Sequence, residues 1–355
     1  MGTTVVVTSN LETQPLLSSN NILLFSNTAH TFPTSVSLPK TQPPPSTKLK
    51  LHFLGHTSSS YNKTKSMASP LQVNASISSF GNEETSSGIV GANDLLIVGP
   101  GILGRLVANL WRQEHEGCEI AGQTVTSDHH EELINLGIAP YLKATKLSRK
   151  YPFVIFCAPP TQTSDYPGDV REAASYWNGE GSFLFTSSSA PYDCYDNGYC
   201  YEDSPVVPIG RSARTDVLLK AEKEVIASSG CVLRLAGLYK EDRGAHVYWL
   251  DKGTVEARPD HILNFIHYED AASLSVAILK KKLRGQIFLG CDNHPLSRQE
   301  VMDIVEKSGK FSKKFEGFTG KNDPLGKKLD NSKTRKEIGW EPKYQSYAQF
   351  LGVSE

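Results

Sequence analysis

The sequence predicts a doubly wound α/β fold with a parallel sheet, spanning about residues 90–355. Two observations predict it: short apolar runs alternate with segments of helical spacing, and a glycine-rich loop directly follows the first apolar run. Strands that are almost entirely apolar are typical of a sheet covered on both faces. Their alternation with helices indicates parallel strands joined by crossover helices, and not separate all-β and all-α parts.

The elements follow in chain order. Strands are expected at 94–98, 119–125, 153–158, 182–187, 231–238 and 286–289. Helices are expected at 103–111, from 127 onward, at 170–177, 216–228, 270–279, 297–305 and 331–339, with Asp270 and Ser297 as N-caps. Residues 239–262 hold glycines and a proline but few periodic apolar positions. They predict an irregular lid over the carboxyl edge of the sheet, where a small C-terminal, substrate-side lobe begins at about residue 239.

The composition changes near residue 90. Before Glu83 the only acidic residue is Glu12, no arginine precedes Arg105, and Ser, Thr, Asn and Pro dominate. Such a segment buries too little apolar surface to fold, and its composition is typical of a plastid transit peptide. We therefore expect residues 1–85 to be a transit peptide and disordered linker that directs the chain to the chloroplast stroma. The alternative is an ordinary disordered tail.

Charge and cysteine usage exclude several classes of partner. The chain has 37 basic and 38 acidic residues and a net charge of −1, which gives no reason to expect nucleic acid or an anionic membrane. No apolar stretch approaches the length of a membrane span. The six cysteines include no C-x-x-C pair, so no metal site is expected. A small-molecule substrate and a monomer or homodimer remain as expectations.

A complete G-x-G-x-x-G lies between the first expected strand and helix, formed by Gly99, Gly101 and Gly104. In this context the motif predicts a dinucleotide site on a Rossmann fold. Gly99 permits the tight turn, Gly101 lets the backbone approach a pyrophosphate, and Gly104 allows close packing of helix on strand. The amides of Ile102 and Leu103 at the helix start then face the anion. A glycine turn without a ligand is the alternative.

In such sites the residue at the end of the second strand contacts the adenosine ribose. An acidic residue there indicates NAD, and a nearby basic side chain indicates NADP. This strand ends in Thr124 and Thr126, which can hydrogen-bond a ribose or its phosphate, while Asp128 is expected to cap the next helix. We therefore expect NADP or NAD, with a slight preference for NADP. Ala158 and Pro159 are expected to wall the adenine side, although a strand-ending Pro-Pro explains them equally well.

Four further segments lie in a recognisable order. They are 187–192 (SSSAPY), 234–239 (RLAGLY), 266–272 (IHYEDAA) and 333–342, a "K-x-x-x-x-I-G-W-x-P" element. Together with the glycine loop, they resemble the short-chain dehydrogenase/reductase superfamily, in its extended or atypical epimerase/dehydratase-like branch. The resemblance covers nearly all of residues 93–351. It implies a Rossmann fold, a nicotinamide cofactor contacted also by Ser187, and an oxidoreductase or epimerase.

The resemblance also implies a catalytic Ser/Thr with a Tyr-x-x-x-Lys pair, which this chain does not match. Ser189 stands at the hydroxyl position, but counting back from Ala221-Glu222 places Arg214 at the tyrosine position and Leu218 at the lysine position. Arginine cannot shuttle a proton near neutral pH. It suits gripping a carboxylate or phosphate, or stabilising an oxyanion.

Other tyrosines offer weaker candidates for the missing acid. Tyr192 is a catalytic candidate, although a packed, hydrogen-bonded tyrosine is the favoured interpretation. Tyr61–Lys65 and Tyr248–Lys252 match the motif by chance, with Tyr248 retaining a small prospect of reaching the cofactor. His267 is expected to be a scaffold histidine, and Arg234 either pairs with a buried acid or faces a substrate.

The function is thus expected to be that of an NAD(P)-binding oxidoreductase or epimerase of a small plastid metabolite, using Ser189, Arg214 and Tyr192. The alternative is a non-catalytic NADP(H)-binding regulatory or scaffold protein.

Overall fold

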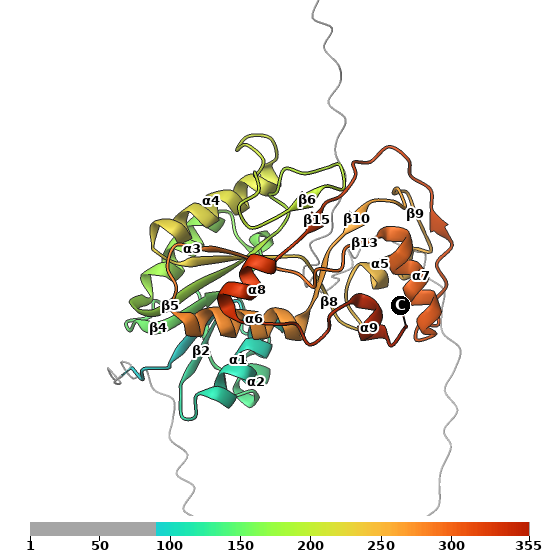
Figure 1. Ribbon diagram of the computed structural model, residues 1–355. Helices are drawn as coiled ribbons and strands as arrows, with labels where there is room; N and C mark the ends of the chain where they lie inside the picture. Colours follow the sequence, from blue (N-terminus) through green and yellow to red (C-terminus); the bar gives the residue numbers. More distant parts are fainter. Residues whose placement is uncertain (1–89, 355) are drawn as a thin grey trace, which may run out of the picture. The chain divides into compact units, whose positions relative to one another are not determined.

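The computed structural model describes residues 90–354. Its centre is a parallel sheet (Figure 1). The sheet has seven strands in the order β3-β2-β1-β4-β5-β7-β12. The order reverses between β1 and β4, which is the point where doubly wound folds bind ligands. The predicted fold class is therefore confirmed. The strands are β1 (Leu95–Val98), β2 (Ile120–Thr124), β3 (Ala139–Leu142), β4 (Tyr151–Phe156), β5 (Trp177–Ser188), β7 (Cys231–Leu235) and β12 (Ile287–Gly290).

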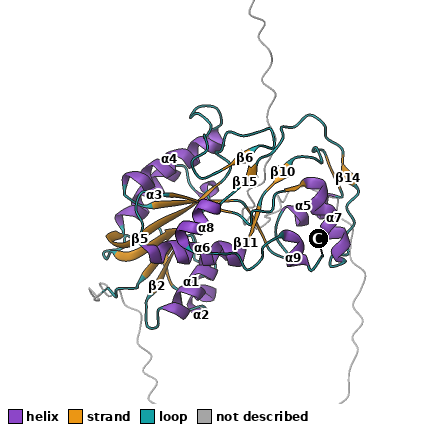
Figure 2. Cartoon of the chain, viewed as in Figure 1, coloured by secondary structure: helices purple, strands orange, loops and turns teal. Residues whose placement is uncertain are grey.

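Helices cover both faces of this sheet (Figure 2). One face carries α1 (Ile102–Glu114) and α6 (Tyr268–Lys281), which also pack against each other. The opposite face carries α3 (Tyr166–Ser175) and α4 (Ala213–Ala227). The short α2 (His130–Asn135) follows β2. Since every crossover helix runs back toward the start of the next strand, the N-termini of α1 and α4 lie at the carboxyl edge of the sheet.

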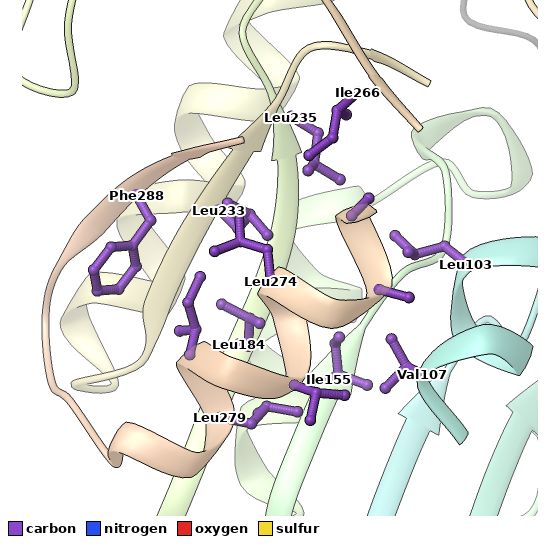
Figure 3. Packing of buried hydrophobic residues seen from close by; sticks show 14 of the residues in the cluster. Leu103, Val107, Ile155, Leu184, Leu233, Leu235, Ile266, Leu274, Leu279 and Phe288 are labelled. Carbon is purple, nitrogen blue, oxygen red and sulfur yellow. The ribbon is translucent and has the colours of Figure 1, made fainter. Parts of the chain in front are cut away.

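Side chains of the strands alternate between the two faces with a period of two. In β1, Leu95 and Ile97 belong to the cluster under α1 and α6, whereas Leu96 and Val98 belong to the cluster under α3 and α4. Each fully buried aliphatic side chain contributes about 1.5–3 kcal/mol relative to exposure. Figure 3 shows the first cluster, in which side chains of the strands and of both helices interlock, among them Leu103, Val107, Ile155, Leu184, Leu233, Leu274 and Leu279.

A third apolar cluster gathers C-terminal elements. It joins α5 (Ala245–Lys252), α7 (Arg298–Ser308) and α9 (Tyr347–Leu351). The helix α8 (Ser332–Ile338) packs instead on α6 and β12. Short ladders complete the chain: β6 (Tyr199–Cys200) with β15 (Lys328–Leu329), β8 (Gly237–Tyr239) with β11 (Phe265–His267), β9 (Thr254–Val255) with β14 (Gly317–Phe318), and β10 (Ile262–Leu263) with β13 (Leu296–Ser297).

Several details of the sequence prediction are wrong. The edge strand β3 was not expected, and residues 239–262 are not irregular throughout, because they include α5. Asp270 does not cap α6: His267 is the N-cap, and its Nδ1 accepts the amide of Glu269 at 3.2 Å. The Asp270 carboxylate instead accepts the amides of Lys343 and Tyr344, which ties the C-terminal segment to α6. Ser297 caps α7 as expected, in a complete capping box.

No helix in residues 90–354 is both long and apolar enough to cross a bilayer. The proposed transit peptide and Tyr61–Lys65 lie outside the described residues.

A buried carboxyl group after β12 predicts a pH-dependent stability. Asp292 is 3 % exposed, and its Oδ2 has no hydrogen-bond partner in the described chain. Burial raises its pKa to about 8, well above the ordinary value of about 3.9. The folded state therefore holds a proton that the unfolded state releases, so the free energy of unfolding should fall as pH rises from about 4 to about 8.

Asp292→Asn should flatten this slope, measured from urea unfolding at a series of pH values. The exposed Asp203→Asn is the matched control and should retain the slope. An unchanged slope in Asp292→Asn would contradict the assignment.

Candidate functional site

The glycine loop joins β1 to α1, and two of its glycines are required by packing. Gly99 has φ +78°, and a Cβ there would lie 2.6 Å from the backbone N and Cα of Ala158 after β4. A Cβ on Gly104 would lie 2.9 Å from Cγ2 of Ile97 and 3.3 Å from the carbonyl oxygen of Gly99. Larger side chains at either position would push α1 or the β4 loop away. These glycines serve the roles that the motif assigns to them.

Gly101 differs, because a Cβ on it would have no atom of the described chain within 4 Å. It is the N-cap of α1, no side chain caps that helix, and its first turn contains no acidic residue. The amides at the start of α1 and the positive end of its dipole are therefore left for an external anion. Packing does not require glycine here, whereas close approach of a ligand to the backbone does. The loop fits a dinucleotide pyrophosphate.

Ile102 and Leu103 follow in the first turn of α1. Leu103 is 7 % exposed and packs in the core (Figure 3). Ile102 is partly buried against the same cluster. Their side chains are committed to packing, so what they can offer an anion is the backbone N–H.

The end of β2 presents hydroxyl groups and no acid at Thr124. Thr124 Oγ1 lies 2.8 Å from Nε2 of His130 and donates to the carbonyl of Tyr141 at 3.3 Å. Thr126 Oγ1 donates to the Asp128 carboxylate at 3.0 Å on the exposed surface. The expectation that Asp128 caps the next helix is wrong, because α2 starts after His129 without a side-chain cap. The Asp128 carboxylate accepts the hydrogen bond of Thr126, two residues before it, and does not cap α2.

The loop after β4 forms the other side of the glycine turn. The Ala158 backbone borders Gly99, and its carbonyl accepts the Tyr166 hydroxyl at 2.8 Å. Pro159 is exposed and precedes a short 3₁₀ turn, Pro160–Gln162. Ala158 thus contacts Tyr166 of α3 on one side and Gly99 of the glycine loop on the other.

Beneath the end of β5 lies a buried ionic network. Glu222 of α4 accepts two hydrogen bonds from Arg234 of β7, at 3.1 Å from Nε and 2.7 Å from Nη2. It also accepts the Ser187 hydroxyl at 2.6 Å. Both ionic side chains are 5 % exposed. Arg234 therefore pairs with a buried acid, one of its two expected alternatives, and the hydroxyl of Ser187 is held inside this network.

The loop after β5 carries Tyr192 and Ser189. Tyr192 is fully buried, its ring lies 4.8 Å from the Arg234 guanidinium, and its hydroxyl donates to the carbonyl of Glu202 at 3.1 Å. Burial raises the pKa of Tyr192 to about 12, with Arg234 opposing the rise. This geometry supports the packed tyrosine over a general acid. Ser189 is partly buried, and its hydroxyl makes no hydrogen bond within the described residues. Its hydroxyl is therefore available to a ligand at this edge.

Lys327 also reaches this loop, a residue that the sequence analysis did not single out. Its Nζ donates to the carbonyls of Tyr192, at 2.5 Å, and Ser189, at 3.4 Å. Burial lowers the pKa of this lysine. Lys327 lies 135 positions after Tyr192, and no local pattern marks it. It ties the C-terminal segment to the Ser189 loop.

Arg214 lies in the first turn of α4, and Leu218 follows one turn later. Leu218 is 3 % exposed and belongs to the cluster against which Ala158 and Ala190 pack. No described side chain restores a Tyr-x-x-x-Lys pair at these positions. Tyr248 and Lys252 lie in α5. Tyr248 packs against the third apolar cluster, and the exposed Lys252 places its ammonium 5.8 Å from the ring centroid of Tyr248.

A hollow lies elsewhere in the described chain, away from the glycine loop. It has a volume of about 530 Å³, and Arg335 pairs with Glu341 within it. Its lining residues are Asn293, Ser332, Arg335, Lys336, Gly339, Trp340 and Glu341. Within residues 90–354, no group of three His, Cys, Asp or Glu side chains is placed to hold a metal ion.

Comparison with known proteins extends the fold assignment. No protein-family model and no curated sequence matches the chain. Among solved structures, it resembles a functionally unknown conserved protein from Silicibacter pomeroyi, with 22 % identity, a TM-score of 0.61, and coverage of 73 % of this chain and 96 % of that one.

Two enzymes complexed with NAD are also similar. UDP-glucuronic acid 4-epimerase from Bacillus cereus has 17 % identity and a TM-score of 0.59, covering 74 % of this chain and 97 % of that one. dTDP-glucose 4,6-dehydratase from Bacillus anthracis has 13 % identity and a TM-score of 0.58, covering 73 % and 94 %. At these identities the likeness shows the fold, so residues 90–354 adopt the Rossmann-type architecture found in NAD-dependent epimerases and dehydratases.

Proposed function

We propose that this chain binds a nicotinamide dinucleotide at the glycine loop and acts as an oxidoreductase or epimerase on a small metabolite. One observation carries the proposal: Gly101 leaves open space in front of an uncapped helix N-terminus. A structural turn would not need glycine there, whereas a pyrophosphate resting on the backbone would. The NAD complexes of structures with the same fold support the choice of ligand.

The preference between the two nucleotides rests on the end of β2. An NAD site places a carboxylate on the ribose 2′-hydroxyl, and Thr124 at this strand end carries none. The next acid along the chain, Asp128, accepts a hydrogen bond from the Thr126 hydroxyl. We therefore keep the slight preference for NADP, whose 2′-phosphate would meet hydroxyl groups without charge repulsion from Thr124.

The residues at the edge of β5 define what chemistry is available. A bound nicotinamide supplies a hydride acceptor or donor. Ser189 offers a free hydroxyl to orient a substrate oxygen, and Arg214 offers a fixed positive charge for an oxyanion or acidic group. Neither moves a proton near neutral pH, and Tyr192 is buried with its pKa raised to about 12.

A second function is favoured by the same residues. Because Leu218 is packed in the core where a catalytic lysine would be expected, the protein is also a candidate non-catalytic NADP(H)-binding regulator or scaffold.

Titration of the full chain with NADPH and NADH, followed by nucleotide fluorescence, tests both functions. Saturable binding is expected, tighter for NADPH, and no association at millimolar nucleotide would overturn the cofactor assignment. Stereospecific loss of label from 4-deuterated NADPH in the presence of plastid extract is expected of an enzyme only. Binding without label loss would favour the regulator.

Localisation is a further proposal. The acid-poor N-terminal composition supports import into the chloroplast stroma. A fusion of residues 1–89 to a fluorescent protein should enter chloroplasts.

The partners and the oligomeric state are also proposals. The near-neutral net charge supports a small-molecule substrate without nucleic acid or membrane. Light scattering of the full chain should distinguish a monomer from a homodimer.

A further inference from the structure

Arg214 is exceptional among the arginines of residues 90–354. The others each donate to a carboxylate, a carbonyl or a tyrosine, whereas Arg214 donates to no described residue. Its Nε is shielded from solvent, and the side chain as a whole is partly buried. A guanidinium without a partner in such a position is a polar group whose hydrogen bonds are missing.

The charge of this guanidinium is not neutralised by the fold. Burial lowers the pKa of Arg214, and no carboxylate opposes the shift. Arginine nevertheless stays protonated near neutral pH, so the positive charge persists in a partly desolvated place. A partly buried cation without a counter-ion is unfavourable until an anion supplies both charge and acceptors.

The neighbouring charged groups are engaged elsewhere. Both oxygens of Asp216, two residues along α4, accept the amide of Gly210, at 3.0 and 2.9 Å. Arg211, three residues before, pairs with Asp193 at 2.5 Å. Arg214 is thus left facing neither an acid of its own helix nor one of the preceding loop.

The position of Arg214 connects it with the site at the carboxyl edge. It precedes Leu218 by one helical turn on the same face of α4, and Leu218 shares a cluster with Ala158 and Ala190. Ala158 borders Gly99, and Ala190 follows Ser189 in the chain. Arg214 therefore lies in the first turn of α4, on the helix face whose Leu218 belongs to the cluster beside the loops after β4 and β5.

We propose that Arg214 is a second anion-binding site, separate from the glycine loop, that holds a carboxylate or phosphate of the substrate beside Ser189. The role in substrate binding rests on the proposed function, whereas anion binding at Arg214 can be measured without it. A planar guanidinium with free donors binds either group through two parallel hydrogen bonds. Substrates without an acidic group near the reacting carbon would then bind weakly.

Inorganic phosphate and malonate are the probes, added to the full chain while the melting temperature is recorded. Because phosphate also suits the glycine loop, the decisive background is Gly101→Asp, in which that loop is blocked. In this background we expect both anions to raise the melting temperature, and the further change Arg214→Met to remove the rise. Phosphate alone or malonate alone would identify which acidic group the site accepts.

The controls separate folding from binding. Arg211→Met removes a paired arginine three residues away and should leave the anion response unchanged, while Arg214→Lys should keep part of it. A response that persists in Gly101→Asp/Arg214→Met, or that is absent in Gly101→Asp itself, overturns the second anion site. NADPH titrations of the wild-type chain and of Arg214→Met run in parallel. If the wild-type chain fails to bind NADPH, the proposed function is refuted, while the anion result still stands.

Discussion

Gly101→Asp is expected to abolish dinucleotide binding and to leave the fold intact. The backbone at Gly101 has φ −74°, which any residue adopts, and a Cβ meets nothing within 4 Å. Asp is a favoured N-cap, so its carboxylate would accept the amides at the start of α1 that a diphosphate would otherwise use. It would also repel the diphosphate by like charge. We expect binding to weaken at least about 100-fold, or about 2.7 kcal/mol, in NADPH fluorescence titration.

Two neighbouring substitutions are the controls for this prediction. Gly101→Ala adds one methyl group in open space and should keep the melting temperature while reducing affinity less than Asp does. Gly99→Ala places a Cβ against the Ala158 backbone at positive φ, so it should lower the melting temperature. Gly101→Asp protein that binds NADPH like the wild type would show that the glycine loop is a structural turn.

The central sheet was predictable because its strands are short, apolar and separated by helices. β1, for example, is buried at every position, and such a run has few other conformations that hide both faces. β3 escaped prediction for a physical reason. It is an edge strand with Pro140 within it, it pairs only with β2, and none of its residues is fully buried. α5 was missed because it is short and bounded by Gly244 and Gly253, which mark loops in sequence.

Residues that act through long-range contacts could not be predicted. The sequence placed Arg234 on a strand and Glu222 on a helix, but their pairing depends on how α4 lies across β7. Lys327 reaches the Ser189 loop from the far end of the chain. The glycine loop was predictable because its three glycines, the strand before them and the helix after them are contiguous in the sequence.

Loss of Glu222 is expected to destabilise the fold strongly. Glu222→Ala removes the acceptor of Arg234 and of the Ser187 hydroxyl, and leaves the buried Arg234 guanidinium without a counter-ion. Breaking one side of a buried ion pair typically costs about 3–5 kcal/mol. We expect a decrease of that size in the free energy of unfolding, measured by urea denaturation.

The same helix supplies a matched control two residues away. Glu224→Ala also removes the carboxylate partner of an arginine, Arg171, but that pair lies on the surface, so the loss should be much smaller. Replacing both buried partners, in Glu222→Leu/Arg234→Met, should recover much of the stability, because an apolar pair leaves no unpaired charge. Equal losses for Glu222→Ala and Glu224→Ala would contradict the argument. Since Arg234 also lies against Tyr192, a double variant that folds but binds substrate poorly would show that the ion pair positions the Ser189–Tyr192 loop and does more than hold the sheet together.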